Sequence, residues 1–248
     1  MGEHTIREIL KRRSDDTQRV IRRRRERSTK RSGTQHRSRG PLIVLVIITL
    51  AIIAGIAYSG WLVSQINNRF TTDRAENTAG RNGLTLSLQA TTQFLPNTLL
   101  AAVDPNFYNN SNMTVSPLTS RLVRMYFPDA SIPAASLMAI ALQYGHSRTD
   151  ILETYINDVT LGSDLGHPIR GFASASQIYF KKPFAQLQPQ DVALLVALST
   201  DPGDFDPRRD SGQALVLRNE VLQLDAQEGV LSQAQVDALK KSPLDLAP

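Results

Sequence analysis

The sequence of 248 residues contains no cysteine. A disulfide framework and a thiolate metal site are therefore both excluded. The sequence also has no internal repeat, and it has no alternation of apolar and polar residues extensive enough to predict a sheet. The fold predicted from these absences is mainly α, and we expect neither a metal nor any other cofactor.

Charged residues are missing from residues 40–68, and residues 42–63 within this stretch are almost wholly apolar. Twenty-two residues rise about 33 Å as an α-helix, which matches the core of a bilayer. Tyr58 and Trp61 stand near the C-terminal end of the stretch, where interfacial aromatic residues are common. A cleaved signal peptide is the alternative, but its apolar region is only roughly 7–15 residues long. We therefore predict a single transmembrane helix over residues 41–64.

Basic residues crowd the segment before this helix. Residues 1–40 hold 14 Lys and Arg against 5 Asp and Glu, whereas the remaining 208 residues carry a net charge of −4. A solvated tail and a nucleic-acid signal are two alternatives for such a segment. The apolar span that follows favours a third, a segment that stays in the cytoplasm and sets the membrane orientation. We predict a type II single-pass protein with its N-terminus inside, its C-terminal body outside and no nucleic-acid partner.

The rest of the chain is predicted to form a polar stalk over residues 65–93, with a short strand at residues 84–88, and a helical domain over residues 94–248. Ser131 with Pro133 is typical of one helix start, and Ser147 with Asp150 of another. Apolar residues between 151 and 159 recur every three or four positions, which predicts one buried helix face. We expect that helix to end at the glycines 162 and 166. Further helices are predicted after residue 171, after Leu187 and from Ser232.

The segment I-L-E-T-Y-I-N (151–157) is followed by G-F-A-S-A-S-Q-I-Y-F-K-K (171–182). Together they resemble the ILExYLN…GxxxAAxxYFGK pattern of family 51 glycosyltransferases, which are peptidoglycan polymerases. Residues 187–198 and R-N-E-V-L (218–222) are similar to later motifs of the same family. The resemblance implies a lysozyme-like helical domain outside the inner (cytoplasmic) membrane of a bacterium. Since this domain reaches the end of the sequence, we expect no transpeptidase module.

The family uses one glutamate as general base on the acceptor sugar and a second near the pyrophosphate leaving group. The resemblance places these two positions at Val103 and Ala135, and it places the family's neighbouring Arg and Lys at Ser131 and Ile132. A base must accept a proton, which a valine cannot do. Asp104 is the acid that survives in the first motif, so it is the catalytic candidate that remains.

Several polar and basic residues match or lie near the family's substrate-binding positions. Arg124 stands where the family has a lysine, Arg121 lies one helical turn away, and guanidinium groups bind phosphate bidentately. The predicted substrate-binding residues are Ser116, Thr119, Arg121, Arg124, Arg148 and Lys182. Ordinary solvated surface charges are the alternative interpretation of the basic members.

Three hypotheses for the function follow. The leading one is a membrane-anchored family 51-like domain that has lost catalysis and serves peptidoglycan assembly by binding lipid-linked precursor or other cell-wall synthases. The second is a divergent but active peptidoglycan glycosyltransferase that uses Asp104. The third is an unrelated helical adaptor, which the ordered series of motifs disfavours.

Overall fold

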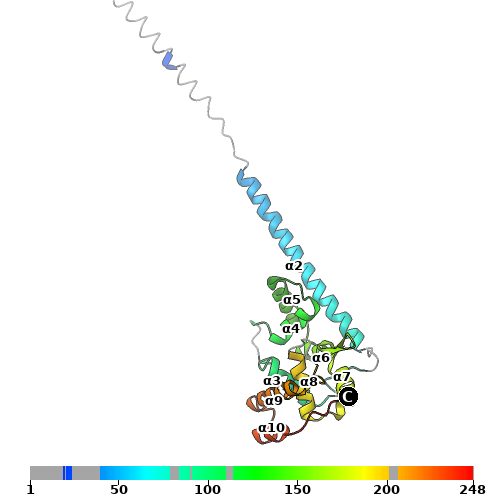
Figure 1. Cartoon of the computed structure of the whole chain (residues 1–248). Coiled ribbons are helices and arrows are strands. Elements are labelled where there is room, and N and C mark those ends of the chain that lie inside the picture. Colours follow the sequence, from blue (N-terminus) through cyan, green and yellow to red (C-terminus); the bar gives the residue numbers. More distant parts are fainter. Residues whose placement is uncertain are drawn as a thin grey trace, which may run out of the picture. The chain divides into compact units, whose positions relative to one another are not determined.

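The computed structural model describes residues 19, 21–23, 40–78, 84–89, 91–109, 114–200 and 206–247. The chain divides into two units, residues 1–54 and 55–248. Most of the basic segment lies outside the described residues. The described elements are α2 (Gly40–Thr78), α3 (Phe94–Val103), α4 (Pro117–Tyr126), α5 (Ile132–Gly145), α6 (Arg148–Asp158), β1 (Thr160–Asp164), β2 (His167–Arg170), α7 (Phe172–Phe180), η2 (Phe184–Gln186), α8 (Pro189–Thr200), α9 (Ser211–Gln227) and α10 (Gln233–Leu239) (Figure 1). The fold is mainly α, as predicted.

Helix α2 contains the predicted membrane span. The part of α2 from Leu42 to Asn77 includes an apolar stretch long enough to cross a membrane. In the first unit, the side chains of residues 42–54 are all exposed. A helix makes its backbone hydrogen bonds within itself, which is what a segment surrounded by lipid requires.

The predicted polar stalk differs from the structure, because α2 continues as a helix to Thr78. Leu62, Ile66 and Phe70 recur every four residues, so they lie on one face, and all three are buried in the core of the second unit. Further along the helix, Asn77 Nδ2 donates to Asp158 Oδ1 at 3.1 Å. The abundance of polar residues in this stretch concealed a half-buried helix.

The strand predicted at residues 84–88 is also absent, since residues 84–87 have no regular secondary structure. The side chain of Asn157 occupies the place of a strand partner there. Its Oδ1 accepts from the backbone N–H of Leu86 at 2.8 Å, and its Nδ2 donates to the Leu86 carbonyl at 2.8 Å. The backbone N–H and carbonyl of Leu86 are therefore both satisfied without a second strand.

A hairpin, which the sequence patterns did not predict, follows α6. Helix α6 ends at Asp158 rather than at the glycines, and β1 pairs with β2 in antiparallel register, with Asp164 opposite His167. Leu165 and Gly166 form the two-residue turn with φ of 50° and 82°. Positive φ at both turn residues suits a tight hairpin, because this backbone twist matches that of the two strands.

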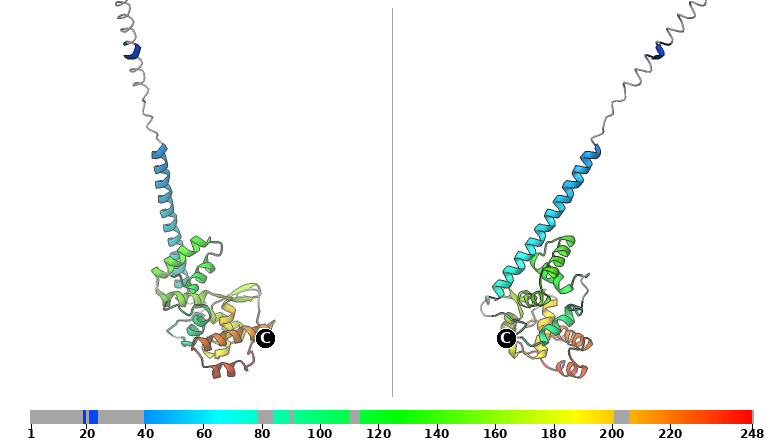
Figure 2. Two further views of the ribbon diagram at one scale, coloured as in Figure 1. Left: turned by 90° about the vertical axis from the view of Figure 1, so that its left-hand side faces the viewer. Right: turned by 180° about the vertical axis from the view of Figure 1, so that it is seen from behind.

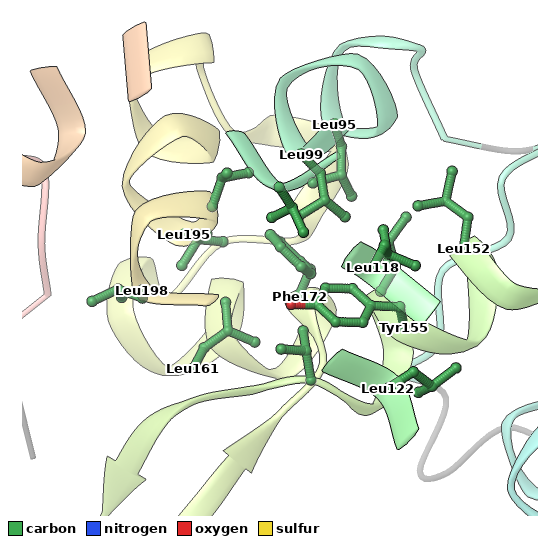
Figure 3. Close-up of a cluster of buried hydrophobic side chains, with 14 of the residues drawn as sticks. Leu95, Leu99, Leu118, Leu122, Leu152, Tyr155, Leu161, Phe172, Leu195 and Leu198 are labelled. Carbon is green, nitrogen blue, oxygen red and sulfur yellow. The ribbon is translucent and has the colours of Figure 1, made fainter. Parts of the chain in front are cut away.

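Helix α8 lies at the centre of the domain. All nine residues from Asp191 to Ser199 are buried, and α8 packs against α3, α7, α9 and β1. Leucines of α3, α4, α6 and α8 surround the rings of Tyr155 and Phe172 in one continuous core (Figure 3). A helix that is apolar nearly all round is stable only when other elements cover every side, as they do here.

Candidate functional site

Asp104, Ser116 and Thr119 come together at the start of α4. Asp104 follows the last residue of α3 and is 2% exposed. Its Oδ2 accepts from Ser116 Oγ at 2.5 Å and from the Leu118 N–H at 3.4 Å, while Ser116 Oγ caps the helix by accepting from the Thr119 N–H at 3.2 Å. A carboxylate at a helix N-terminus stabilises the helix through its dipole. These three predicted site residues therefore lie inside the core, where they fix the position of α4.

Arg121 and Arg124 lie on the exposed face of α4 and line a cleft of about 380 Å³. Nη1 of Arg121 donates to the carbonyl of Thr200 at 3.1 Å, which ties α4 to the end of α8. Nη1 of Arg124 donates to the carbonyl of Ala130 at 3.2 Å. Each guanidinium has five N–H donors, and the hydrogen bond to a carbonyl uses one of them.

Tyr155 also lines this cleft, although the sequence pattern predicted it only as part of the buried face of α6. Its hydroxyl lies 3.5 Å from the carbonyl of Ser199. Burial raises the pKa of Tyr155, while the nearby Arg121 guanidinium acts in the opposite direction. The phenol is therefore protonated at neutral pH. The remaining lining residues are Ser120, Met125, Val159, Thr160 and Ser199, and no described lining residue carries a carboxylate.

Arg148 and Lys182 are absent from the described residues that line this cleft. The Arg148 guanidinium lies over the ring of Phe107, 5.3 Å from its centroid. Lys182 forms an ion pair with Asp245 near the C-terminal end of the described chain. Of the four basic residues predicted from the sequence, the structure brings Arg121 and Arg124 into one cleft and places the other two elsewhere.

Val103 and Ala135 occupy the two positions that the family resemblance assigns to glutamates. Val103 is the last residue of α3 and is 8% exposed, and Ala135 lies in the first turn of α5 and is 6% exposed. Both side chains contribute to the apolar core. Within the part of the chain that the structure describes, no group of three or more His, Asp or Glu side chains could hold a metal ion.

Comparisons with known proteins agree with these motifs. Residues 116–225 match the family described as Transglycosylase. The chain is 32% identical over 182 residues to penicillin-binding protein 1B of Escherichia coli (strain K12), covering 62% of this chain and 21% of that protein. It is 28% identical over 186 residues to penicillin-binding protein 1B of Haemophilus influenzae, covering 65% of this chain and 24% of that protein.

Among solved structures, the crystal structure of penicillin-binding protein 1A from Haemophilus influenzae aligns with 66% of this chain and 18% of that chain, at 22% identity and a TM-score of 0.45. The chain spans between 14% and 24% of the length of the first curated relatives that it matches. The similarity is concentrated where α4 to α9 build the cleft and the core around α8. Residues 116–225 therefore form a region similar to the Transglycosylase family, in agreement with the sequence motifs that resemble family 51 glycosyltransferases.

Proposed function

We propose that this chain is a membrane-anchored component of peptidoglycan assembly that binds lipid-linked precursor and does not polymerise it at a normal rate. The helical domain would lie on the outer side of the bacterial cytoplasmic membrane, held by α2. The observation that carries the proposal is the contrast between two parts of the domain. The cleft keeps two guanidinium groups, whereas the positions assigned to the two glutamates hold buried aliphatic side chains.

The loss of the base argues for impaired catalysis. Proton abstraction needs an acceptor within hydrogen-bond reach of the attacking hydroxyl, and neither Val103 nor Ala135 provides one. Asp104 is the nearest acid in sequence, but its carboxylate is buried and already accepts from Ser116 and Leu118. Releasing Asp104 to act as a base would remove the support of the α4 N-terminus. We therefore assign Asp104 a positioning role in place of the catalytic role that the sequence suggested.

The cleft supports binding of a pyrophosphate group. Arg121 and Arg124 are three residues apart on one helix face, and both line the same hollow. Guanidinium groups recognise phosphate oxygens through paired N–H donors, and this recognition requires no carboxylate. Hydrogen bonds to charged groups contribute about 1.5–3 kcal/mol each, so two arginines account for binding without turnover.

A divergent but active glycosyltransferase is the second candidate. The observation that favours it is that Asp104 adjoins the assigned base position and is linked through Ser116 to the helix that carries the arginines. We also propose that other cell-wall synthases bind this domain, because a domain that does not polymerise precursor can act only through the molecules that it binds.

A polymerisation assay combined with a binding assay tests the proposal on the purified full-length protein. We expect salt-sensitive binding of lipid-linked disaccharide precursor and no glycan chains. Replacing Arg121→Ala and Arg124→Ala together should reduce affinity by at least about tenfold, from the loss of charged hydrogen bonds. The matched control replaces Arg170 and Arg209 by alanine, since both are exposed and absent from the described lining of the cleft.

Two outcomes would contradict the proposal. Glycan chains formed by the parent protein would establish the active enzyme, and their loss in Asp104→Asn with precursor binding and folding unchanged would indicate that Asp104 is the base. Equal affinities of the cleft variant and the control variant would show that the two arginines do not hold the precursor.

A further inference from the structure

Asp158 joins three helices through hydrogen bonds at the C-terminal end of α6. It is 4% exposed, and its two carboxylate oxygens have different partners. Oδ1 accepts from Asn77 Nδ2 of α2 at 3.1 Å, and Oδ2 accepts from the hydroxyl of Tyr126, the last residue of α4, at 2.7 Å. Burial and the neighbouring Asp158 raise the pKa of Tyr126, so its hydroxyl stays protonated and remains a donor. One buried side chain thus links the ends of α2, α4 and α6.

Further polar contacts of α2 surround this link. Arg69 Nε lies 3.1 Å from Asp73 Oδ2, and the Arg69 guanidinium lies 5.5 Å from the centroid of the Tyr126 ring. Arg74 forms an ion pair with Asp150 in the first turn of α6. The C-terminal end of α2, in cyan, accordingly lies against the domain in both views of Figure 2. Hydrogen bonds depend on direction, whereas apolar contacts do not, so these polar contacts fix the rotation of α2 about its own axis.

The link adjoins the cleft that contains the two arginines. On α4, Tyr126 follows Arg124 and Met125, which both line the cleft. At the end of α6, Asp158 precedes residues 159–160, which line it as well. The hydrogen bond between Tyr126 and Asp158 therefore joins two lining segments at the point where each leaves the cleft. Because the separation of these segments sets the shape of the cleft, the hydrogen bond helps to fix that shape.

We propose that Asp158 is a positioning residue that makes the shape of the cleft depend on the attachment of α2. This inference rests on the proposed function, because it assigns control of the same precursor-binding cleft to the helix that contains the membrane span. Asn77 is absent from the described lining of the cleft, yet it donates to the carboxylate that holds Tyr126. A displacement of α2 that breaks this hydrogen bond changes how α4 presents Arg121 and Arg124.

A link that only stabilises the fold is the alternative. A carboxylate at the C-terminal end of a helix is unfavourable for the helix dipole, so Asp158 does not stabilise α6 by itself. Its two oxygens accept separately from donors on two other helices, whereas an asparagine would present one oxygen and one NH2 group. The side chain at this position therefore suits the joining of α2 to α4.

Two measurements on the full-length protein in nanodiscs test the proposal. The first is the affinity for lipid-linked disaccharide precursor. The second requires no precursor and reports the shape of the cleft. Because the chain has no cysteine, spin labels can be attached at Ser120→Cys on α4 and Thr160→Cys on β1, which both line the cleft, and the distance between the labels is measured.

The test variants each remove one donor to Asp158. Asn77→Ala removes the amide on α2, and Tyr126→Phe removes the hydroxyl on α4 but keeps the ring beneath Arg69. The matched control is Thr98→Val, which also removes a hydroxyl that donates to a buried carboxylate, at a position absent from the described lining of the cleft. Circular dichroism checks that each variant is folded.

A double substitution tests whether the hydrogen bond itself is responsible. Asn77→Asp combined with Asp158→Asn exchanges the two partners and keeps the net charge. The amide at position 158 then donates to the carboxylate at position 77 and still accepts from Tyr126. Each of the two single substitutions removes the hydrogen bond between positions 77 and 158, so only the double variant should resemble the parent.

We expect Asn77→Ala and Tyr126→Phe each to weaken precursor binding by roughly 2–30-fold, the range for substitutions that affect a site without touching its ligand. Both should shift or broaden the distribution of label distances, although Asn77 lies on α2. Thr98→Val should match the parent in both measurements. The double substitution should restore both the affinity and the label distance.

Two outcomes would overturn the proposal. Label distances in Asn77→Ala and Tyr126→Phe equal to those in Thr98→Val would leave Asp158 with a stabilising role alone. A double variant that behaves like its two single substitutions would show that the hydrogen bond from α2 is not the cause. A parent protein that binds no precursor would refute the proposed function, whereas the label distances would still decide the positioning role, so the two failures are distinct.

Discussion

Asp225 is a buried carboxyl group that should make the stability of the domain depend on pH. It lies on α9, is 0% exposed, and its Oδ2 accepts from Thr98 Oγ1 of α3 at 3.1 Å. Its Oδ1 has no hydrogen-bond partner among the described residues. Burial disfavours the charged form and raises the pKa of Asp225 from 3.8 to about 7, and the hydrogen bond from Thr98 offsets only part of this shift.

The direction of the pH effect follows from linkage. Below about pH 4 the carboxyl is protonated in both the folded and the unfolded state, so it adds no pH dependence. Between pH 4 and 7 the unfolded chain releases the proton while the folded domain keeps it, so the free energy of unfolding falls as pH rises. A difference of about 3 pKa units corresponds to about 4 kcal/mol, which is the largest loss expected by pH 8.

Asp225→Asn should remove this dependence, because an amide of the same shape still accepts from Thr98 and does not ionise. Denaturant unfolding of the full-length parent and variant, measured from pH 4 to 8, gives the difference in stability at each pH. We expect this difference to move in favour of the variant by up to about 4 kcal/mol as pH rises. Glu220→Gln, an exposed carboxylate on the same helix, is the control and should follow the parent. Parallel curves for Asp225→Asn and the parent would refute the reasoning.

Three further predictions concern the backbone, the position assigned to the catalytic base and the topology. Gly171→Ala should lower the free energy of unfolding by on the order of 2–4 kcal/mol, because φ is +78° and an added Cβ would lie 2.5 Å from the Asn157 carbonyl oxygen. Gly166→Ala has a similar φ but open space around the added Cβ, so it should lower the free energy of unfolding by about 1 kcal/mol. Equal losses in the two variants, measured by denaturant unfolding, would contradict the clash at Gly171. Under the proposed function, Val103→Glu alone should yield no glycan chains, since Ala135 still occupies the position that the resemblance assigns to the second glutamate; measurable glycan chains would show that this position is misplaced. A reporter that requires the periplasm should be active when fused after Pro248, whereas activity of a cytoplasm-dependent reporter alone would reverse the orientation.

Much of the helical framework could be predicted because its signals are local. Ser147 caps α6 by accepting from the Asp150 N–H at 3.1 Å, and Ser232 forms a capping box with Gln235, as their spacing indicated. The start of α5 after Ser131 was also predicted, although the side chain of Ser131 makes no capping hydrogen bond. Caps and helix periodicity depend on residues within one or two turns, so they are visible in a single sequence.

The hairpin and the end of α2 were missed for a related reason. The glycines around Leu165 are consistent with both a helix end and a tight turn, and the pairing of Asp164 with His167 distinguishes the two. In α2, Ile66 and Phe70 are separated by polar residues whose exposure depends on which face meets the domain. Which residues of such a helix are buried depends on the surface that the helix packs against, so the polar residues alone do not predict it.

Residue identities at the candidate site could likewise be predicted from the sequence, whereas the directions of the side chains could not. The sequence by itself determined the apolar span, the family motifs and the presence of Val103 and Ala135 at the two positions that the resemblance assigns to glutamates, because residue identity settles whether a side chain can accept a proton. Only the tertiary structure decided which polar residues face the cleft. It turned Asp104 inward to support α4 and placed Arg121 and Arg124 beside Tyr155. Burial and direction depend on elements that are distant in sequence and adjacent in the fold, so no local pattern encodes them.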